Sequence, residues 1–172
     1  LDRVDILGKL GYTVMISNFS EYYRMVDYIS TFTNQHIGVA MGVNNLLDVF
    51  DEEYYKNLPG GILEAFGKFF KKDMRVYLYP YKDMKTGELL TSENLKVHDN
   101  LKELYKYFKL NKRIVDIENF NPKFLEIYSR EILKKIVTQE LGWEEELPIG
   151  VSEMIKDRQM FGYKELTFDG LN

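Results

Sequence analysis

Cysteine is absent from the 172 residues of this chain. Its absence excludes disulfide bonds, catalysis by a thiolate and zinc sites built on cysteine. Histidine is nearly absent, since only His36 and His98 are present and they stand far apart in the sequence. Their spacing predicts no metal site, and no Ser-His-Asp triad can be proposed with any specificity. We therefore expect no metal centre held by the protein itself.

Long apolar runs and an excess of basic residues are also missing. No apolar stretch approaches the roughly 20 residues that span a bilayer, and no basic-then-apolar signal segment opens the chain. The formal net charge is −4, which argues against a broad surface for nucleic acid or anionic lipid. We expect a cytoplasmic protein with no membrane or nucleic-acid partner. Because the chain begins with Leu1, we interpret it as a fragment of a longer protein.

The composition that remains is typical of one globular domain. Hydrophobic residues make up 45% of the chain and charged residues 29%, which favours a packed domain over a disordered segment. The 13 tyrosines and 11 phenylalanines predict a core rich in aromatic packing. We expect residues 1–172 to form a single domain, with an α/β sheet part in residues 1–84 and a mainly helical part in residues 85–172.

The first part alternates between strand and helix patterns. Short β-rich or continuously apolar runs predict strands at residues 12–17, 37–43 and 75–81. Amphipathic spacing predicts helices between these strands, one of which opens at Gly60-Gly61. This alternation implies crossover connections and a parallel sheet. The predicted fold class is α/β, a Rossmann-like three-layer domain with a small, mostly parallel sheet and a helical C-terminal part.

The second part is dominated by helix signals. Apolar positions at helical spacing lie in residues 101–108, and residues 114–117 predict a short strand. Asn121-Pro122 is typical of a helix start, with Asn as the N-cap and Pro in the first turn. We expect that helix to run through Ile136. Two further helices are expected to close the chain, at residues 143–147 and 150–161.

The most informative run begins at Ile127-Tyr128-Ser129-Arg130-Glu131-Ile132-Leu133 and continues to Leu147-Pro148 and Phe161-Gly162-Tyr163. It resembles the end of nicotinate-nucleotide adenylyltransferases. That family carries Ile-Ser-Ser-Thr-x-Ile-Arg at a helix start, which Ile127, Ser129 and Ile132 match in register. It then closes with a Leu-Val-Pro turn, a helix and a Leu-Tyr ending. Here Leu133 stands at the position of the family's Arg.

The resemblance implies a nucleotide-binding domain. In the family, hydroxyl groups, helix N-terminal amides and the Arg hold the triphosphate, so Ser129 and Arg130 become the phosphate contacts and Lys134 a further source of charge. It also implies ATP with Mg²⁺ as cofactor, a small-molecule nucleotide as partner and a role in NAD biosynthesis. The alternative is that the helix from Asn121 runs through Ser129, whose amide would then not be free and whose neighbours would face water.

Catalysis is a separate question, because the same enzymes carry a His-x-Gly-His motif. His36-Ile37-Gly38-Val39 reproduces only its first three positions and leads into a predicted strand rather than a helix. From Gly11 to Tyr163 the chain also resembles the C-terminal section of long bacterial proteins that bear the adenylyltransferase label. The resemblance therefore implies a C-terminal half without the catalytic histidines. No catalytic residue is assigned, and activity of this chain alone stays open.

Two further features carry alternatives. Pro59-Gly60-Gly61 opens a helix, so Gly60 and Gly61 form either a second anion cradle or a plain tight turn. Tyr77, Tyr79 and Tyr81 share one face of a predicted strand, either as a stacking platform or as a face covered by other elements. The alternative function is a non-catalytic interaction or assembly domain of a larger bacterial protein. Its aromatic surfaces would dock against other domains of the same chain or a second copy.

Overall fold

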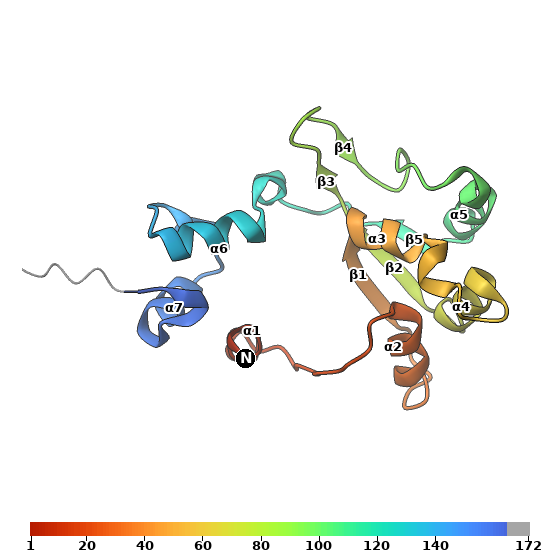
Figure 1. The fold of residues 1–172 in the computed structure, drawn as a ribbon, viewed down its shortest axis with the longest axis horizontal. Helices are drawn as coiled ribbons and strands as arrows, with labels where there is room; N and C mark the ends of the chain where they lie inside the picture. The colour runs from red at the N-terminus through yellow and green to blue at the C-terminus, as the bar shows by residue number, and fades with distance from the viewer. Residues whose placement is uncertain (165–172) are drawn as a thin grey trace, which may run out of the picture. The chain divides into compact units, whose positions relative to one another are not determined.

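The computed structural model describes residues 1–164, which fall into two compact units (Figure 1). Residues 18–120 form an α/β unit, and residues 1–17 form a helical unit together with the chain from Asn121 onward. The predicted α/β class with a small parallel sheet is confirmed. The units do not divide at residue 84, because residues 85–120 supply two strands and a helix to the α/β unit.

The sheet of the α/β unit has three parallel strands in the order β1-β2-β5. Strand β1 spans Gly38–Gly42, β2 spans Arg75–Tyr79 and β5 spans Ile114–Asp116. All three were predicted from their β-rich or apolar composition. A separate antiparallel pair joins β3 (Tyr81–Lys82) to β4 (Leu89–Leu90).

One helix of the α/β unit precedes β1 and three lie between its strands, where amphipathic spacing predicted helices. They are α2 (Tyr22–Ile29), α3 (Val43–Val49), α4 (Gly61–Phe69) and α5 (Lys102–Leu110), with short 3-10 turns η1 (Glu52–Tyr55) and η2 (Asp99–Leu101). Helix α4 begins at Gly61, whose φ of 55° lies in the left-handed region that favours glycine. The Pro-Gly-Gly turn therefore sets the start of this helix.

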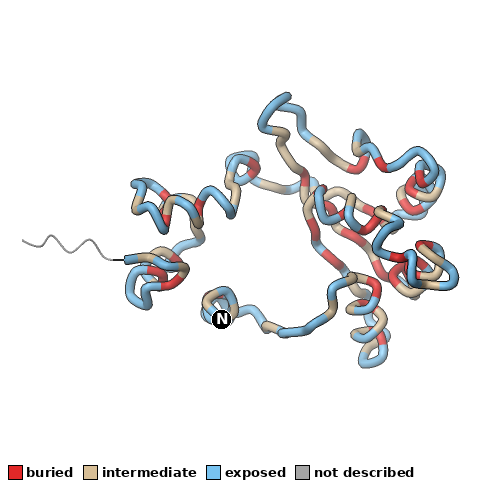
Figure 2. Tube along the Cα trace, viewed as in Figure 1, coloured by how far each residue is buried: buried red, intermediate tan, exposed pale blue. Residues whose placement is uncertain are grey.

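Aromatic rings fill the core of the α/β unit, as the composition predicted. Phe66 on α4 is 3% exposed, and its ring centroid lies 4.9 Å from Phe50, 5.5 Å from Phe70 and 5.4 Å from Phe108. The edge-on orientation of these pairs is the favourable one for aromatic rings. Figure 2 shows most of the buried positions around the sheet and its helices, with fewer in the helical unit.

Only one face of the parallel sheet is buried within the α/β unit. Val39, Val76 and Ile114 belong to the core, whereas Gly38 and Ala40 on the opposite face are exposed. Successive strands are added in one direction, and crossovers of one hand then bring the helices to one face. Residues 18–120 therefore form two layers and do not themselves supply the third layer that the sequence led us to expect.

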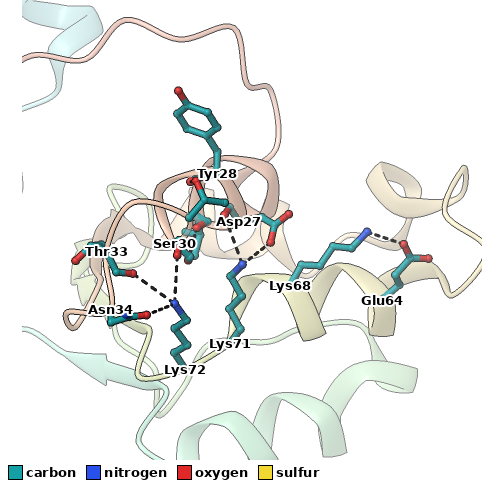
Figure 3. Close-up of polar contacts among 11 residues, drawn as sticks. Asp27, Tyr28, Ser30, Thr33, Asn34, Glu64, Lys68, Lys71 and Lys72 are labelled. Atoms are coloured by element: carbon teal, nitrogen blue, oxygen red, sulfur yellow. Dashed lines mark hydrogen bonds and ion pairs between the residues drawn. The ribbon is translucent and has the colours of Figure 1, made fainter.

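Two lysines join the end of α4 to α2 (Figure 3). The Lys71 ammonium donates to the Asp27 carboxylate at 2.5 Å. The Lys72 ammonium donates to the backbone oxygen of Ser30 at 3.2 Å and to the Asn34 side-chain oxygen at 2.7 Å. Both lysines follow the last residue of α4, and Lys72 supplies the positive charge that the C-terminal carbonyls of α2 attract.

The helical unit contains α1 (Asp2–Lys9), α6 (Ser129–Thr138) and α7 (Val151–Arg158), with 3-10 turns η3 (Pro122–Glu126), η4 (Trp143–Glu146) and η5 (Met160–Gly162). Its core is a small apolar cluster that includes Ile6, Ile136 and Trp143. The Asp2 carboxylate accepts a hydrogen bond from the Phe161 N–H at 2.9 Å. Helix α1 is therefore tied to the C-terminal turn of the same unit.

Two local predictions are wrong in this unit. Residues 12–17 form no strand, because β propensity alone does not order a strand that lacks a ladder partner. The helix predicted from Asn121 through Ile136 is broken. Asn121 does cap a turn, accepting from the Lys123 N–H at 3.1 Å, but that turn is η3 and ends at Glu126. Tyr128 is then extended, with φ −111° and ψ 117°, before α6 begins.

None of the helices among residues 1–164 combines the length and the apolar character needed to cross a membrane.

Candidate functional site

The start of α6 is where the sequence predicted phosphate contacts. Helix α6 begins at Ser129, and the backbone oxygen of Tyr128 accepts the N–H groups of Glu131 at 2.9 Å and Ile132 at 3.1 Å. The first N–H groups of any α-helix lack an intrahelical partner, and no side chain among the described residues caps this end. Ser129 therefore opens the helix rather than lying inside it, which removes the alternative in which its amide is buried in a helical turn.

Two cations stand on the first turns of this helix. Arg130 and Lys134 are four residues apart, on neighbouring turns of one helical face, and both are exposed. Neither forms an ion pair with any residue in the range 1–164. Lys135 differs, because it donates to the Glu146 carboxylate, and that hydrogen bond raises the pKa of Lys135. Arg130 and Lys134 thus remain available to an anion, although Glu131 places one negative charge in the same turn.

Ser129 also borders an apolar groove of about 370 Å³ within the helical unit. The groove lies between α1, α6 and α7, and Leu7, Leu133 and Pro148 contribute to its walls. Leu133 is the residue that replaces the Arg of the adenylyltransferase motif. Its side chain therefore serves an apolar wall, and positive charge at this helix comes from Arg130 and Lys134, which do not line the groove.

The second predicted cradle is occupied by the protein's own carboxylate. The Gly60 N–H donates to Glu64 Oε2 at 3.1 Å, and Lys68 donates to Glu64 Oε1 at 2.7 Å (Figure 3). The Lys68 ammonium and then the Gly60 N–H hold the pKa of Glu64 below its usual value. A phosphate at Gly60 and Gly61 would have to displace this ionised carboxylate. These glycines belong to the α/β unit, whereas Ser129, Arg130 and Lys134 belong to the helical unit.

Tyr77, Tyr79 and Tyr81 do not form the three-membered stacking platform that the sequence offered, because β2 ends at Tyr79. Tyr81 packs against the core from β3, while Tyr77 and Tyr79 stay on the open face of the sheet. The Tyr77 hydroxyl lies 3.2 Å from His36 Nε2, and His36 Nδ1 lies 2.5 Å from the backbone oxygen of Asp73. His36 is therefore tied to the amino edge of the sheet and stands before a strand, unlike the first histidine of the adenylyltransferase motif.

A polar cluster at this edge was not singled out from the sequence. Asp73 accepts from Arg75 at 3.2 Å and lies 3.9 Å from an Arg113 nitrogen. Arg113 also donates to the backbone oxygen of Met74 at 3.1 Å, which fixes the start of β5 beside β2. Asp73, Arg75 and Arg113 thus pair with one another within this cluster. Among residues 1–164 there is no group of three or more His, Asp or Glu side chains placed to hold a metal ion.

Comparison with known proteins adds no family to this description. No protein-family model matches the chain, and neither a curated protein nor a solved structure matches it. Its function therefore has to be argued from its own residues.

Proposed function

We propose that the chain is a nicotinate-nucleotide adenylyltransferase-like domain that binds a nucleotide through its phosphates at the start of α6. One observation carries this proposal: α6 begins at Ser129, so free amides, a hydroxyl and two unpaired cations stand together at a helix N-terminus. A helix N-terminus favours anions through its exposed N–H groups and its dipole.

Each residue has a definite part in this proposal. The N–H and hydroxyl of Ser129 would donate to a phosphate oxygen, and Arg130 and Lys134 would offset the charge of the neighbouring phosphates. ATP with Mg²⁺ is the nucleotide form that the resemblance favours, and nicotinate mononucleotide is the second candidate. Adenylyl transfer is not assigned to this chain, since its two histidines do not form the His-x-Gly-His pair. We also propose a cytoplasmic location, which the lack of cysteine supports, and no nucleic-acid partner, which the net charge of −4 supports.

A ligand-dependent shift in thermal unfolding tests the nucleotide proposal. A ligand that binds only the folded state raises the unfolding free energy by about 1.4 kcal/mol at ten times its Kd. We expect ATP at millimolar concentration to raise the melting temperature. The double variant Arg130→Gln/Lys134→Gln should weaken binding about tenfold, because each charge-assisted contact at an exposed site is worth roughly 0.7 kcal/mol and about 1.4 kcal/mol corresponds to a factor of ten.

Lys9→Gln is the matched control, because Lys9 is another exposed cation of the helical unit. It should leave the melting shift unchanged. The nucleotide proposal is contradicted if ATP, nicotinate mononucleotide and NAD all leave the melting temperature unchanged. Equal ATP binding by the control and by the double variant would remove Arg130 and Lys134 from the site.

A second candidate function, assembly with a second copy of the chain, is favoured by the open face of the sheet. Parallel sheets are normally covered on both faces, and residues 18–120 cover only one. On the open face, the side chains of Tyr77 and Tyr79 stand beside the small residues Ala40 and Gly42 of β1. A Cβ at Gly42 would meet no atom within 4 Å. A two-fold contact uses the same surface of both copies, so the open face would pack against its own counterpart.

Light scattering after size exclusion tests assembly. We infer a dimer at about 100 µM, and Ala40→Glu should convert it to a monomer because it places a charge in the contact. Leu63→Glu is the control, since Leu63 is 66% exposed on α4 and faces away from the core. A monomeric chain at that concentration, or a dimer that survives Ala40→Glu, would exclude this face as the contact.

A further inference from the structure

A hollow of about 360 Å³ lies in the α/β unit, between the start of α2, the surface of α3 and the turn η1. Three aromatic side chains, Phe19, Tyr22 and Tyr54, contribute to its walls, and so do the carboxylates Glu21 and Asp48. No lysine, arginine or histidine lines it. The hollow thus combines aromatic rings with negative charge, the opposite character to the start of α6.

The core holds one aromatic wall of the hollow, Tyr22, and its base. The Tyr22 ring lies 6.4 Å from the buried Phe69, and the Phe19 ring lies 5.4 Å from Tyr28. Tyr55 closes the base: it is 5% exposed, and its hydroxyl donates to the backbone oxygen of Val49 at 2.8 Å. The contacts of Tyr22 and Tyr55 fix these two rings before any ligand arrives, which lowers the entropic cost of binding.

The two carboxylates are not equivalent. Glu21 accepts from the Ser20 hydroxyl at 2.8 Å and pairs with Arg24 at 3.2 Å, so its charge is largely offset. Asp48 forms no ion pair with a residue between 1 and 164. Burial and then the negative charge of Asp48 raise the pKa of Tyr22, so that carboxylate acts on the aromatic wall of the hollow. Asp48 is the uncompensated charge here.

A small organic ammonium ion is the ligand class that this arrangement fits. Aromatic faces attract cations through their quadrupole, and a nearby carboxylate adds direct attraction. We propose that the hollow binds a methylated ammonium group between Tyr22, Tyr54 and Phe19, with Asp48 as its counter-ion. A phosphorylated ligand is disfavoured by the two carboxylates. The hollow belongs to the α/β unit and the proposed nucleotide site to the helical unit, and neither proposal depends on the other.

An NMR titration with choline tests this proposal, with 3,3-dimethyl-1-butanol as the probe of equal shape and no charge. We expect choline to shift the amide signals of Tyr22, Asp48 and Tyr54 in a saturable manner. The neutral alcohol should bind at least about fivefold more weakly, since a cation–π contact at an exposed site corresponds to roughly that factor.

Asp48→Asn removes the counter-ion with little change of shape at an exposed position. It should weaken choline about fivefold and leave the alcohol unchanged, while Glu103→Gln, an exposed acid on α5, should alter neither. Tyr54→Leu keeps an apolar side chain but removes the ring, and should weaken choline alone. Equal binding of choline and the alcohol, or choline binding that Asp48→Asn does not change, would overturn the proposal. So would a titration to tens of millimolar choline that shifts none of the three signals.

Discussion

Replacing Phe66 by Ala is the sharpest test of the aromatic core in the α/β unit. The ring is 3% exposed and lies between Phe50, Phe70 and Phe108 at centroid distances of 4.9–5.5 Å. Truncating a buried Phe to Ala typically costs about 3–5 kcal/mol, and each aromatic pair contributes about 0.5–1.5 kcal/mol beyond burial. Because four ring pairs are lost, counting Tyr55 at 6.1 Å, we expect the upper part of that range, about 4–5 kcal/mol.

Urea denaturation followed by far-UV circular dichroism measures this loss. A slope of about 2 kcal/mol per molar urea converts it to a midpoint shift of roughly 2 M, a large part of the about 5–15 kcal/mol that stabilises a typical domain. Leu63→Ala on the same helix is the matched control, because that side chain is 66% exposed and should cost less than about 0.5 kcal/mol. A loss below about 1 kcal/mol for Phe66→Ala would refute the placement of its ring at the centre of the core.

Three further changes probe polar contacts. Ser92→Ala should lower the unfolding free energy measured by urea denaturation by about 1–3 kcal/mol. Ser92 is 3% exposed, and its hydroxyl donates to the Asp116 carboxylate at 2.7 Å. Ser92→Thr, which keeps the hydroxyl, should lower the unfolding free energy less. Lys72→Met should lower the melting temperature by the equivalent of roughly 1 kcal/mol, because it removes the donor to the C-terminal carbonyls of α2. An unchanged melting temperature would mean that water replaces the ammonium group. A hydrogen bond from Lys156 at 2.8 Å holds the pKa of Glu144 below its usual 4.5, so this pair stabilises the helical unit above about pH 4.5 and its contribution is lost as the pH falls below that value. Melting followed by the single tryptophan should show a weaker dependence on pH between 6 and 3 in Glu144→Gln, and an identical dependence would contradict this assignment.

The candidate phosphate site shows how far local patterns reach. Residues 127–133 resemble a helix-start motif and so predict a helix start at Ser129. Asn121-Pro122 is an equally good start signal for the same helix. The structure uses both signals, first for the 3-10 turn η3 and then for α6 at Ser129. Capping patterns mark where a helix can begin, but the packing of Ile132 and Ile136 into the helical unit decides which turn continues as an α-helix.

The aromatic hollow carried no recognisable signal in the sequence. Phe19, Asp48 and Tyr54 come from three separate segments, and none stands in a motif. Each has an ordinary local interpretation, as a linker residue, a helix-surface acid or a turn residue. Only the approach of α2 to the α3–η1 segment brings them to one hollow, and that approach depends on tertiary packing.

By itself, the amino-acid sequence determined the strands β1, β2 and β5, the helices between them and the aromatic character of the core. Composition and period act locally, so they can be read one segment at a time. Tertiary structure alone decided that residues 12–17 form no strand, that residues 18–120 cover only one face of the sheet, and that residues 1–17 join the C-terminal helices. These outcomes depend on which surfaces meet across long stretches of chain. The start of α6 at Ser129 is such an outcome. Two start signals, Asn121-Pro122 and Ser129, were present in the sequence, and packing decided which of them begins the α-helix.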